Sequence, residues 1–486
     1  FQRLTEASTD FEALPESRLG DLATVCEVYV NDYIVIATPS SREQLRHVAN
    51  AVLMGIHDVF PPDDDDSNDP ISHKKILKKE GVFALEKDLL GFDFNGQPGE
   101  HTMWLEAPKR DKLLTILHGW CRAGADRNLG IPFDVFRSTT YQLRWAFISI
   151  PQGNGLLSPF NKVLAKEPRF VFLHRNKHLF EGVRDCRTLL RESVAEPTRC
   201  KELVQGWPDY IGVKDASKHG VGGIIVGESK ACIPTVFRLE WPADIKADLV
   251  SEQNPNGRIT NSDLELAGMV ILWLIMEVVC SDLADAHCAL FSDNSPTIGW
   301  VRRLASKYST VAAQLLRVLA LRLKKKKASS LTPLHIGGTQ NAMTDVPSRS
   351  FGSNAKWHCK TDCELLTLFN RLFPLPNKSS WTVFRPTYEI SMRVICVLRM
   401  QDSTLAEWRK LPRIGSHTGV VGTSCAGLWE WTLRYRLPAL ENESEHSRLL
   451  RVQSELEHLV EENKSKLAQS VAQSQPLERR SLWTSE

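Results

Sequence analysis

Between Trp207 and Phe351, the spacing of hydrophobic positions changes repeatedly between the two-residue period of strands and the longer period of helices. Short β-branched runs bounded by turn residues predict strands, and longer apolar runs predict helices. We expect strands at 210–214, 221–226 and 235–241, a helix at 262–280, a strand at 288–291, a long helix at 296–326, a strand at 331–336 and a short helix at 341–350. This succession predicts an α/β domain built on a mixed sheet.

The N-terminal part shows a different pattern. The stretch VYVNDYIVIA, residues 28–37, predicts two short strands hinged on Asn31 and Asp32, and a helical period follows over 41–60. Two prolines and a polar run then predict a linker. Past residue 352 the pattern fades, apart from a charged amphipathic helix at 443–467. We therefore expect four parts, with a mostly helical C-terminal tail: 1–60, 70–205, 207–352 and 353–486.

Length and composition indicate the number of domains and the cellular compartment. At 486 residues it is long for one hydrophobic core, which agrees with several domains. Its 11 cysteines form no C-x-x-C pair, which indicates free thiols inside the cell, in the cytoplasm or the nucleus. It begins at Phe1 without a charged and apolar leader, so we expect a fragment of something longer and no secretory signal. The most apolar run, 264–279, is too short to span a membrane and contains two glutamates.

Positive charge is concentrated in one segment, although the net charge of the chain is only +2. Between Asn294 and Thr344 there is no Asp or Glu, and nine Lys and Arg residues are present. Such a segment is expected to attract a phosphate backbone, although a solvated basic helix face remains the alternative. The residues that we expect to contact nucleic acid are Arg302, Arg303, Lys324, Lys325, Lys326 and Lys327.

Four carboxylates fall at the ends of the predicted strands and helices. Asp215 shares a strand face with Ile211 and Val213, and Glu265 lies in the first turn of an apolar helix. Asp293 ends the predicted strand 288–291 at its C-terminal mouth, where sites in α/β sheets collect. Asp345 follows ten positions after His335.

Each acid has a structural alternative when it is taken alone. Asp215 fits an Asx-turn, and Glu265 fits a capping box with Ser262. A competing box formed by Thr260 and Asp263 would free Glu265, and the sequence does not decide between the two boxes. Ser295 and Pro296 suit the start of the next helix, so Asp293 is not needed as its cap.

Four acids at one end of a sheet repel one another strongly unless cations lie between them. Hard oxygen ligands favour Mg²⁺ or Mn²⁺ over zinc. Two Mg²⁺ ions roughly 4 Å apart would relieve the repulsion and would also supply the means to cut a phosphodiester. One ion would activate a water, and the other would stabilise the leaving oxygen.

The order of these residues on this succession of elements resembles the ribonuclease H domain of retroelement reverse transcriptases. The matching segments are DAS with Asp215, NSDLELAG with Glu265, LFSDNSPTIGWV with Asp293, and HIGGTQNAMTDVPSR with His335 and Asp345. The resemblance implies a ribonuclease H-like fold, four metal ligands and a histidine that assists product release or proton transfer. Integrases and transposases on the same fold are disfavoured, because their Glu follows the second Asp.

The resemblance extends upstream to a partial reverse-transcriptase palm and thumb. The segment YVND, with Tyr29, Asn31 and Asp32, resembles the Tyr-x-Asp-Asp box of these polymerases. The segments DLLGFDF and LRWAFISIPQGNGLLSPFN resemble the region that joins the palm to the thumb and ribonuclease H. Asn31 stands where a metal-binding aspartate belongs, and a neutral amide holds Mg²⁺ poorly, so we expect reverse transcription to be severely impaired.

The sequence therefore predicts a retrotransposon-derived endonuclease that cleaves the RNA strand of RNA–DNA hybrids, with Asp215, Glu265, Asp293 and Asp345 as metal ligands and His335 assisting. The alternative is a degenerate or co-opted product of a transposable element that binds nucleic acid without cleaving it. The altered residue Asn31 makes this alternative reasonable, because one catalytic motif has already diverged.

Overall fold

The structure is a computed structural model, and it divides the chain into two compact units, Phe1–Lys109 and Arg110–Glu486. The predicted segment 70–205 is thus divided between both units. The structure describes residues 24–29, 32–37, 41–61, 83–97, 101–124, 126, 129–203, 207–227, 232–280, 283–306, 309–326, 330–352, 356–375 and 379–400. The helix predicted at 443–467 lies outside these residues.

The first unit contains the predicted hairpin. Strands β1 (Thr24–Tyr29) and β2 (Asp32–Ala37) pair antiparallel, and helix α3 (Arg42–Val59) follows. Ser41 caps α3 by accepting a hydrogen bond from the backbone N–H of Gln44 at 3.2 Å. The unit also contains an antiparallel meander of β3 (Glu86–Leu89), β4 (Phe92–Asn95) and β5 (Thr102–Leu105).

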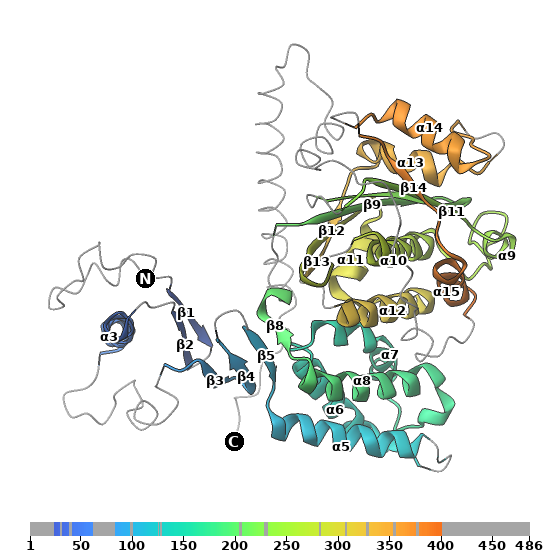
Figure 1. The fold of residues 1–486 in the computed structure, drawn as a ribbon. Coiled ribbons are helices and arrows are strands. Elements are labelled where there is room, and N and C mark those ends of the chain that lie inside the picture. Colours follow the sequence, from blue (N-terminus) through green and yellow to red (C-terminus); the bar gives the residue numbers. More distant parts are fainter. Residues whose placement is uncertain are drawn as a thin grey trace. The chain divides into compact units, whose positions relative to one another are not determined.

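The second unit is organised around a six-stranded mixed sheet with the order β13-β12-β9-β10-β11-β14 (Figure 1). The central strands β9, β10 and β11 are antiparallel, while β12 and β13 run parallel to β9, and β14 runs parallel to β11. The strand bounds are β9 Tyr210–Ala216, β10 Gly220–Gly227, β11 Thr235–Glu240, β12 His287–Ser292, β13 Ser330–His335 and β14 Thr382–Phe384. The predicted α/β domain on a mixed sheet is confirmed.

Helices cover both faces of this sheet (Figure 1). One face packs against α10 (Asn261–Val279) and α11 (Ser295–Arg303), and α12 (Thr310–Lys326) and α15 (Tyr388–Leu398) pack on α10 in the same core. The other face packs against α13 (Ala342–Ser348) and α14 (Asp362–Leu372). Alternate residues of β9 enter the two cores, because successive side chains point to opposite faces of a strand.

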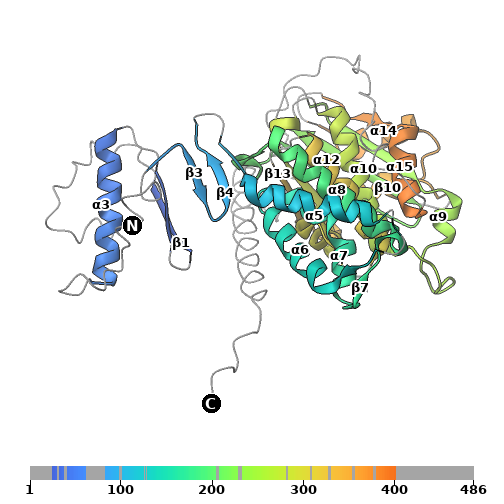
Figure 2. The same cartoon turned by 90° about the horizontal axis from the view of Figure 1, so that it is seen from below.

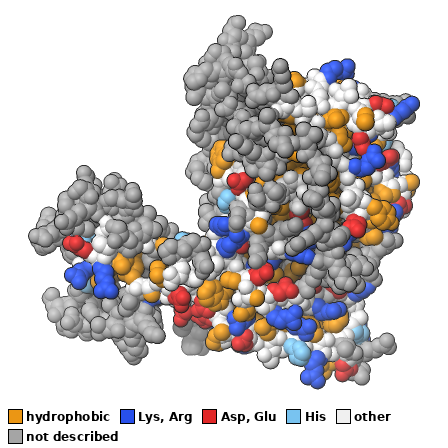
Figure 3. Space-filling view, viewed as in Figure 1, with side chains coloured by type: hydrophobic (Ala, Val, Ile, Leu, Met, Phe, Trp, Pro, Cys, Tyr) orange, Lys and Arg blue, Asp and Glu red, His pale blue; other side chains and the backbone are white. Residues whose placement is uncertain are grey.

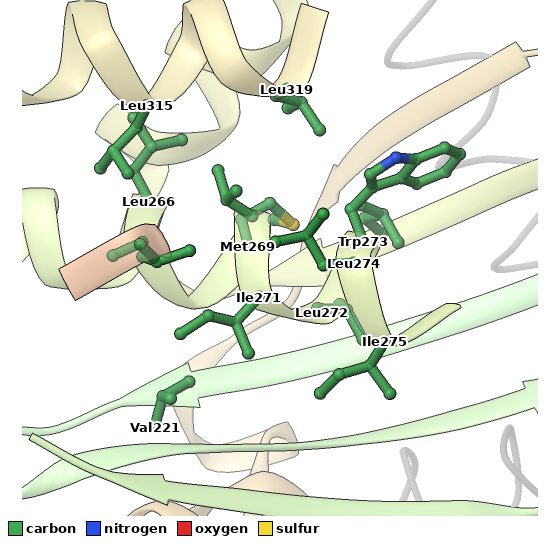
Figure 4. Packing of buried hydrophobic residues seen from close by; sticks show 14 of the residues in the cluster. Val221, Leu266, Met269, Ile271, Leu272, Trp273, Leu274, Ile275, Leu315 and Leu319 are labelled. Carbon is green, nitrogen blue, oxygen red and sulfur yellow. The ribbon is translucent and has the colours of Figure 1, made fainter. Parts of the chain in front are cut away.

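Helix α10 is buried on nearly all of its sides. Figure 4 shows its side chains between Val221 of the sheet and Leu315 and Leu319 of α12. Trp273 and Met269 are fully buried within it. A helix that is hydrophobic all round belongs inside a large core, and this explains why the most apolar run of the sequence needs no membrane. None of the helices described here is long and apolar enough to cross a bilayer.

The prediction of one long helix at 296–326 is wrong, because the structure has two helices there, α11 and α12. Helix α11 ends at Leu304, whose φ of +48° is left-handed and cannot continue a right-handed helix. Helix α12 then starts next to Ser309, whose hydroxyl oxygen accepts a hydrogen bond from the backbone N–H of Ala312 at 2.9 Å.

A helical layer packs on the side of α12 that faces away from the sheet (Figures 1 and 2). It consists of α5 (Ala107–Ala123), α6 (Phe133–Ala146), α7 (Ser158–Leu164) and α8 (Lys177–Ala195), with the short strands β6 (Ile131–Pro132) and β7 (Phe170–Val171). Its core contains Phe136, which stacks on Trp120 and Phe160 with ring centroids 5.5 and 5.7 Å away. Lys162 of this layer donates a hydrogen bond to Thr310 of α12 at 2.7 Å.

The sheet continues past residue 352, where the sequence predicted the end of this domain. Strand β14 pairs with β11, and α15 packs into the same core as α10 and α12. Residues up to 400 thus belong to the domain that carries the acidic cluster. The nine cysteines whose side chains the structure describes are all free thiols, as the irregular spacing predicts.

Candidate metal centre

Three of the four predicted acids meet at one end of the sheet. Asp215 lies near the end of β9, Glu265 in the first turns of α10, and Asp293 directly after β12. One carboxylate oxygen from each residue lies within 4.8 Å of the other two. Asp215 and Glu265 are each only 3% exposed, whereas Asp293 is partly exposed and opens the cluster to solvent. The donor set consists of hard oxygens, which fits Mg²⁺ or Mn²⁺.

The capping of α10 explains why Glu265 is available for the cluster. Thr260 is the N-cap, and its hydroxyl oxygen accepts a hydrogen bond from the backbone N–H of Asp263 at 3.2 Å. Asp263 reciprocates by accepting from the backbone N–H of Thr260 at 2.9 Å. The competing box with Ser262 is therefore not formed, and the Glu265 side chain points to the carboxylates instead.

As predicted, Asp293 does not cap helix α11, but Ser295 does not cap it either. The side chain of Asn294 caps α11 by accepting a hydrogen bond from the backbone N–H of Thr297 at 2.9 Å. Asn is as good an N-cap as Ser, and Pro296 tolerates a position in the first turn, so the sequence allows either arrangement.

Asp345 lies beside the cluster but outside the close triplet. It lies on α13, and one of its oxygens forms an ion pair with the guanidinium of Arg349 at 2.8 Å. The same guanidinium lies 3.9 Å from Asp215, so Arg349 links the two acids. The hydroxyl of Ser348, also on α13, donates a hydrogen bond to Asp215. The structure therefore places α13 next to the cluster with Asp345 at its edge.

A glycine allows α13 to approach the sheet this closely. Gly222 of β10 pairs with Asp215 of β9, and a Cβ at position 222 would lie 2.3 Å from the backbone nitrogen of Ser348. No side chain fits in that space. The contact sets the distance between the acid on β9 and the acid on α13.

His335 ends β13 and is exposed at the same edge of the sheet. Its Nε2 lies 3.1 Å from the carbonyl oxygen of Asp293. The following turn also approaches this acid, since a Cβ at Gly338 would lie 3.5 Å from Asp293 Oδ2. The histidine is therefore next to the cluster.

Burial and mutual repulsion shift the pKa values of these acids in one direction. Burial raises the pKa of Asp215, and the charge of Asp293 raises it further, against the hydrogen bond from Ser348. Burial also raises the pKa of Glu265, against the charge of Lys214. The pKa of Asp345 rises through burial and through the charge of Asp215. Burial is the main cause of this shared rise, and the repulsion between the acids adds to it.

Lys214 belongs to the site and was missed by the sequence analysis. Its side chain is fully buried, and its ammonium forms an ion pair with Oε2 of Glu265. The signal was present, because a lysine in the buried strand YIGVKDA needs an acid as a partner. The partner lies 51 residues away along the chain, so the sequence does not identify it.

Only some of the basic residues predicted to contact nucleic acid are exposed. Arg302 and Arg303 are exposed at the end of α11, and Lys325 is exposed on α12. The prediction that Lys324 contacts nucleic acid is wrong. Lys324 is only 7% exposed, and it donates hydrogen bonds to Glu196 O and Thr198 Oγ1. The side chain of Lys326 and all of Lys327 lie outside the described residues.

Several positive charges of the segment 294–344 are neutralised by acids from outside it. Arg317 pairs with Asp185 at 2.6 Å and with Glu181 at 2.8 Å, and Arg322 pairs with Glu277. These acids come from other parts of the chain. On the face shown in Figure 3, Lys and Arg side chains are interspersed with Asp and Glu among the residues coloured by type.

The segment that resembles a polymerase motif is described only in part. Tyr29 and Asp32 are paired in the β1–β2 hairpin, as predicted for that motif. Asn31 and the side chains of Tyr29 and Asp32 lie outside the described residues. The predicted loss of a metal ligand at Asn31 therefore stays a prediction from the sequence.

Comparisons with known proteins give distant structural likenesses. No protein-family model and no curated protein sequence matches the chain. The solved structures that are similar to it include the foamy viral protease-reverse transcriptase in complex with double-stranded DNA, at 12% identity and a TM-score of 0.27, over 64% of this chain and 55% of that one. The same viral protein in complex with an RNA/DNA hybrid is similar at 12% identity and a TM-score of 0.28, over 81% of this chain and 38% of that one.

The chain thus spans about half or less of the length of these viral proteins. TM-scores this low assign neither a fold nor an activity, so the site is interpreted from its own residues.

Proposed function

We propose that the second unit is a ribonuclease H-like endoribonuclease that cleaves the RNA strand of RNA–DNA hybrids. One observation carries the proposal: carboxylates from β9, α10 and the end of β12 place one oxygen each within 4.8 Å. Three acids from separate elements crowd together only at a considerable electrostatic disadvantage, unless a divalent cation joins them. The order of strands and the motif HIGGTQNAMTDVPSR, which resembles retroelement ribonucleases H, support the same assignment.

In this proposal Asp215, Glu265 and Asp293 hold the metal, with Asp345 completing the ligand set. Bound Mg²⁺ would activate a water as nucleophile and stabilise the leaving oxygen of the phosphodiester. His335 stands beside Asp293 at the open side of the cluster, where it takes up or delivers a proton. Arg302 and Arg303 lie exposed on α11, the helix that follows Asp293, and contact the backbone of the hybrid.

The test is Mg²⁺-dependent cleavage of an end-labelled RNA–DNA hybrid by the full chain. Asp293→Asn removes one charged ligand with little change in shape and should reduce the rate roughly 10²-fold or more. Glu252→Gln, which neutralises an exposed acid, is the matched control and should cleave like wild type. Cleavage by Asp293→Asn at the wild-type rate would refute the assignment.

One observation favours the second candidate, a protein that binds nucleic acid without cleaving it. Lys214 already neutralises Glu265, so one of the proposed ligands is engaged by the protein itself. Filter binding separates the two candidates: intact affinity for the hybrid with no cleavage in Mg²⁺ or Mn²⁺ would favour the binder. DNA synthesis is not proposed, because Asn31 replaces a metal-binding acid, and primer extension on an RNA template checks this.

A further inference from the structure

Lys214 enters the acidic cluster from inside the protein. Its side chain runs from β9 toward α10, where a Cβ at Gly268 would lie 3.3 Å from Lys214 Cδ. Gly268 lies one turn after Glu265, and its missing side chain makes room for Val221, 2.8 Å from such a Cβ, as well as for the lysine stem. The ammonium then reaches Oε2 of Glu265. Because Lys214 is fully buried, its charge cannot turn outward to water.

The charges of the cluster balance with a single divalent ion. Asp215, Glu265, Asp293 and Asp345 contribute four negative charges. Lys214 pairs with Glu265, and Arg349 pairs with Asp345, which together supply two positive charges. Two negative charges remain, on Asp215 and Asp293, and one Mg²⁺ cancels them. Two Mg²⁺ ions would leave an excess of two positive charges in a buried site, which is unfavourable.

We propose that the ammonium of Lys214 takes the place of one of the two cations, so that the site binds one divalent ion between Asp215 and Asp293. This inference rests on the proposed function, because it concerns the same cluster. It proposes one ion where the sequence predicts two Mg²⁺ ions, and it makes Lys214 a positioning residue for Glu265. It also explains how a strand can carry a buried lysine directly before a metal-binding aspartate.

An ordinary structural ion pair would not predict this stoichiometry. A buried Lys–Glu pair elsewhere in a core stabilises the fold but has no effect on metal binding. Here the engaged oxygen belongs to one of three acids within 4.8 Å of one another, so removal of the ammonium returns a negative charge to the cluster. The number of bound ions therefore distinguishes the two roles.

The experiment counts Mn²⁺ ions by electron paramagnetic resonance on the full chain, saturated with a nuclease-resistant hybrid of 2′-O-methyl RNA and DNA. Wild type should bind one ion. Lys214→Met leaves three unpaired acids, a negative charge between that of one and two divalent ions, so it should bind a second ion, more weakly than the first. Lys214→Met combined with Glu265→Gln should return to one. Lys246→Met, which breaks the partly exposed pair with Glu240, is the matched control and should leave one ion.

Two ions in wild type, no ion in wild type, or one ion in Lys214→Met would each overturn the inference. If Lys214→Met is unfolded without metal, Mn²⁺ must restore the wild-type circular dichroism spectrum, and failure to do so counts against it as well. The ion count does not depend on cleavage. One ion in wild type and two in the variant, without cleavage of an ordinary hybrid, would refute the nuclease and leave the role of Lys214 intact.

Discussion

Replacement of Arg317 by methionine tests whether α12 is a structural helix or a nucleic-acid-binding helix. Arg317 has a side chain that is only 10% exposed, and its guanidinium contacts Asp185 at 2.6 Å and Glu181 at 2.8 Å. Asp185 is also buried, with 5% of its side chain exposed. Methionine fills the volume of the stem but leaves two acids beside an apolar side chain. Breaking one member of such a buried group typically costs about 3–5 kcal/mol of stability.

The assay is thermal and urea unfolding, followed by tryptophan fluorescence. For a unit of this size we expect a fall in Tm on the order of 10 °C. The double variant Arg317→Met/Asp185→Leu should recover most of the loss, because it removes the uncompensated buried charge as well. Arg137→Met breaks an exposed pair with Asp134 and should cost only about 0–1 kcal/mol.

Hybrid affinity completes this test. If α12 is structural, folded Arg317→Met retains the wild-type salt dependence of binding. A variant with wild-type stability and weakened hybrid binding would refute the conclusion that this arginine joins α12 to α8, and it would restore the basic helix predicted from the sequence.

The other predictions concern the cluster and its surroundings. Arg302→Gln and Arg303→Gln should each lower the slope of log affinity against log salt by about 1, measured by filter binding, because each is expected to contact one phosphate. Gly222→Ala should cost roughly 1–3 kcal/mol in urea unfolding and reduce hybrid cleavage, because the new methyl group collides with α13; unchanged stability would contradict the close contact. In EDTA at pH 7, Asp293→Asn should melt at a higher temperature than wild type, because it removes repulsion from the cluster. Burial and repulsion raise the pKa values of Asp215, Glu265 and Asp345 in the folded state, so their destabilising effect is present at pH 7 and fades as the pH falls through those raised values. The difference between wild type and variant should shrink over that range, and Mg²⁺ should reverse its sign. A difference independent of pH and Mg²⁺ would contradict mutual repulsion.

Between residues 210 and 292 the sequence predicted the strands and the long helix well, because their signals are local. The β-branched runs of β9 and β10 and the apolar period of α10 are strong, and the acids stand at the element ends that the pattern defines. The predicted meeting of Asp215, Glu265 and Asp293 followed from that succession together with the resemblance, and the geometry confirms it.

The sequence could not predict features that depend on partners far along the chain. Arg317 and Glu181 are separated by 136 positions, and Lys324 and Thr198 by 126 positions. In the sequence, the basic segment 294–344 therefore shows no acidic partners, because the fold brings them to it from distant positions. The break after α11 was missed for another reason. A left-handed residue at a helix end is usually glycine or asparagine, whereas here it is Leu304, which gives no such signal in the sequence.

The position of α12 between two layers also limits how the protein can be divided. Its apolar face is covered by α10, while Arg317 and Lys324 on its other face are held by groups from 181–198. A fragment that started at Trp207 would expose this second face, with arginine and lysine stems next to uncovered leucines, and would tend to aggregate. Shortened versions for biochemistry should therefore begin before α5 at Ala107 and retain the helices before the sheet.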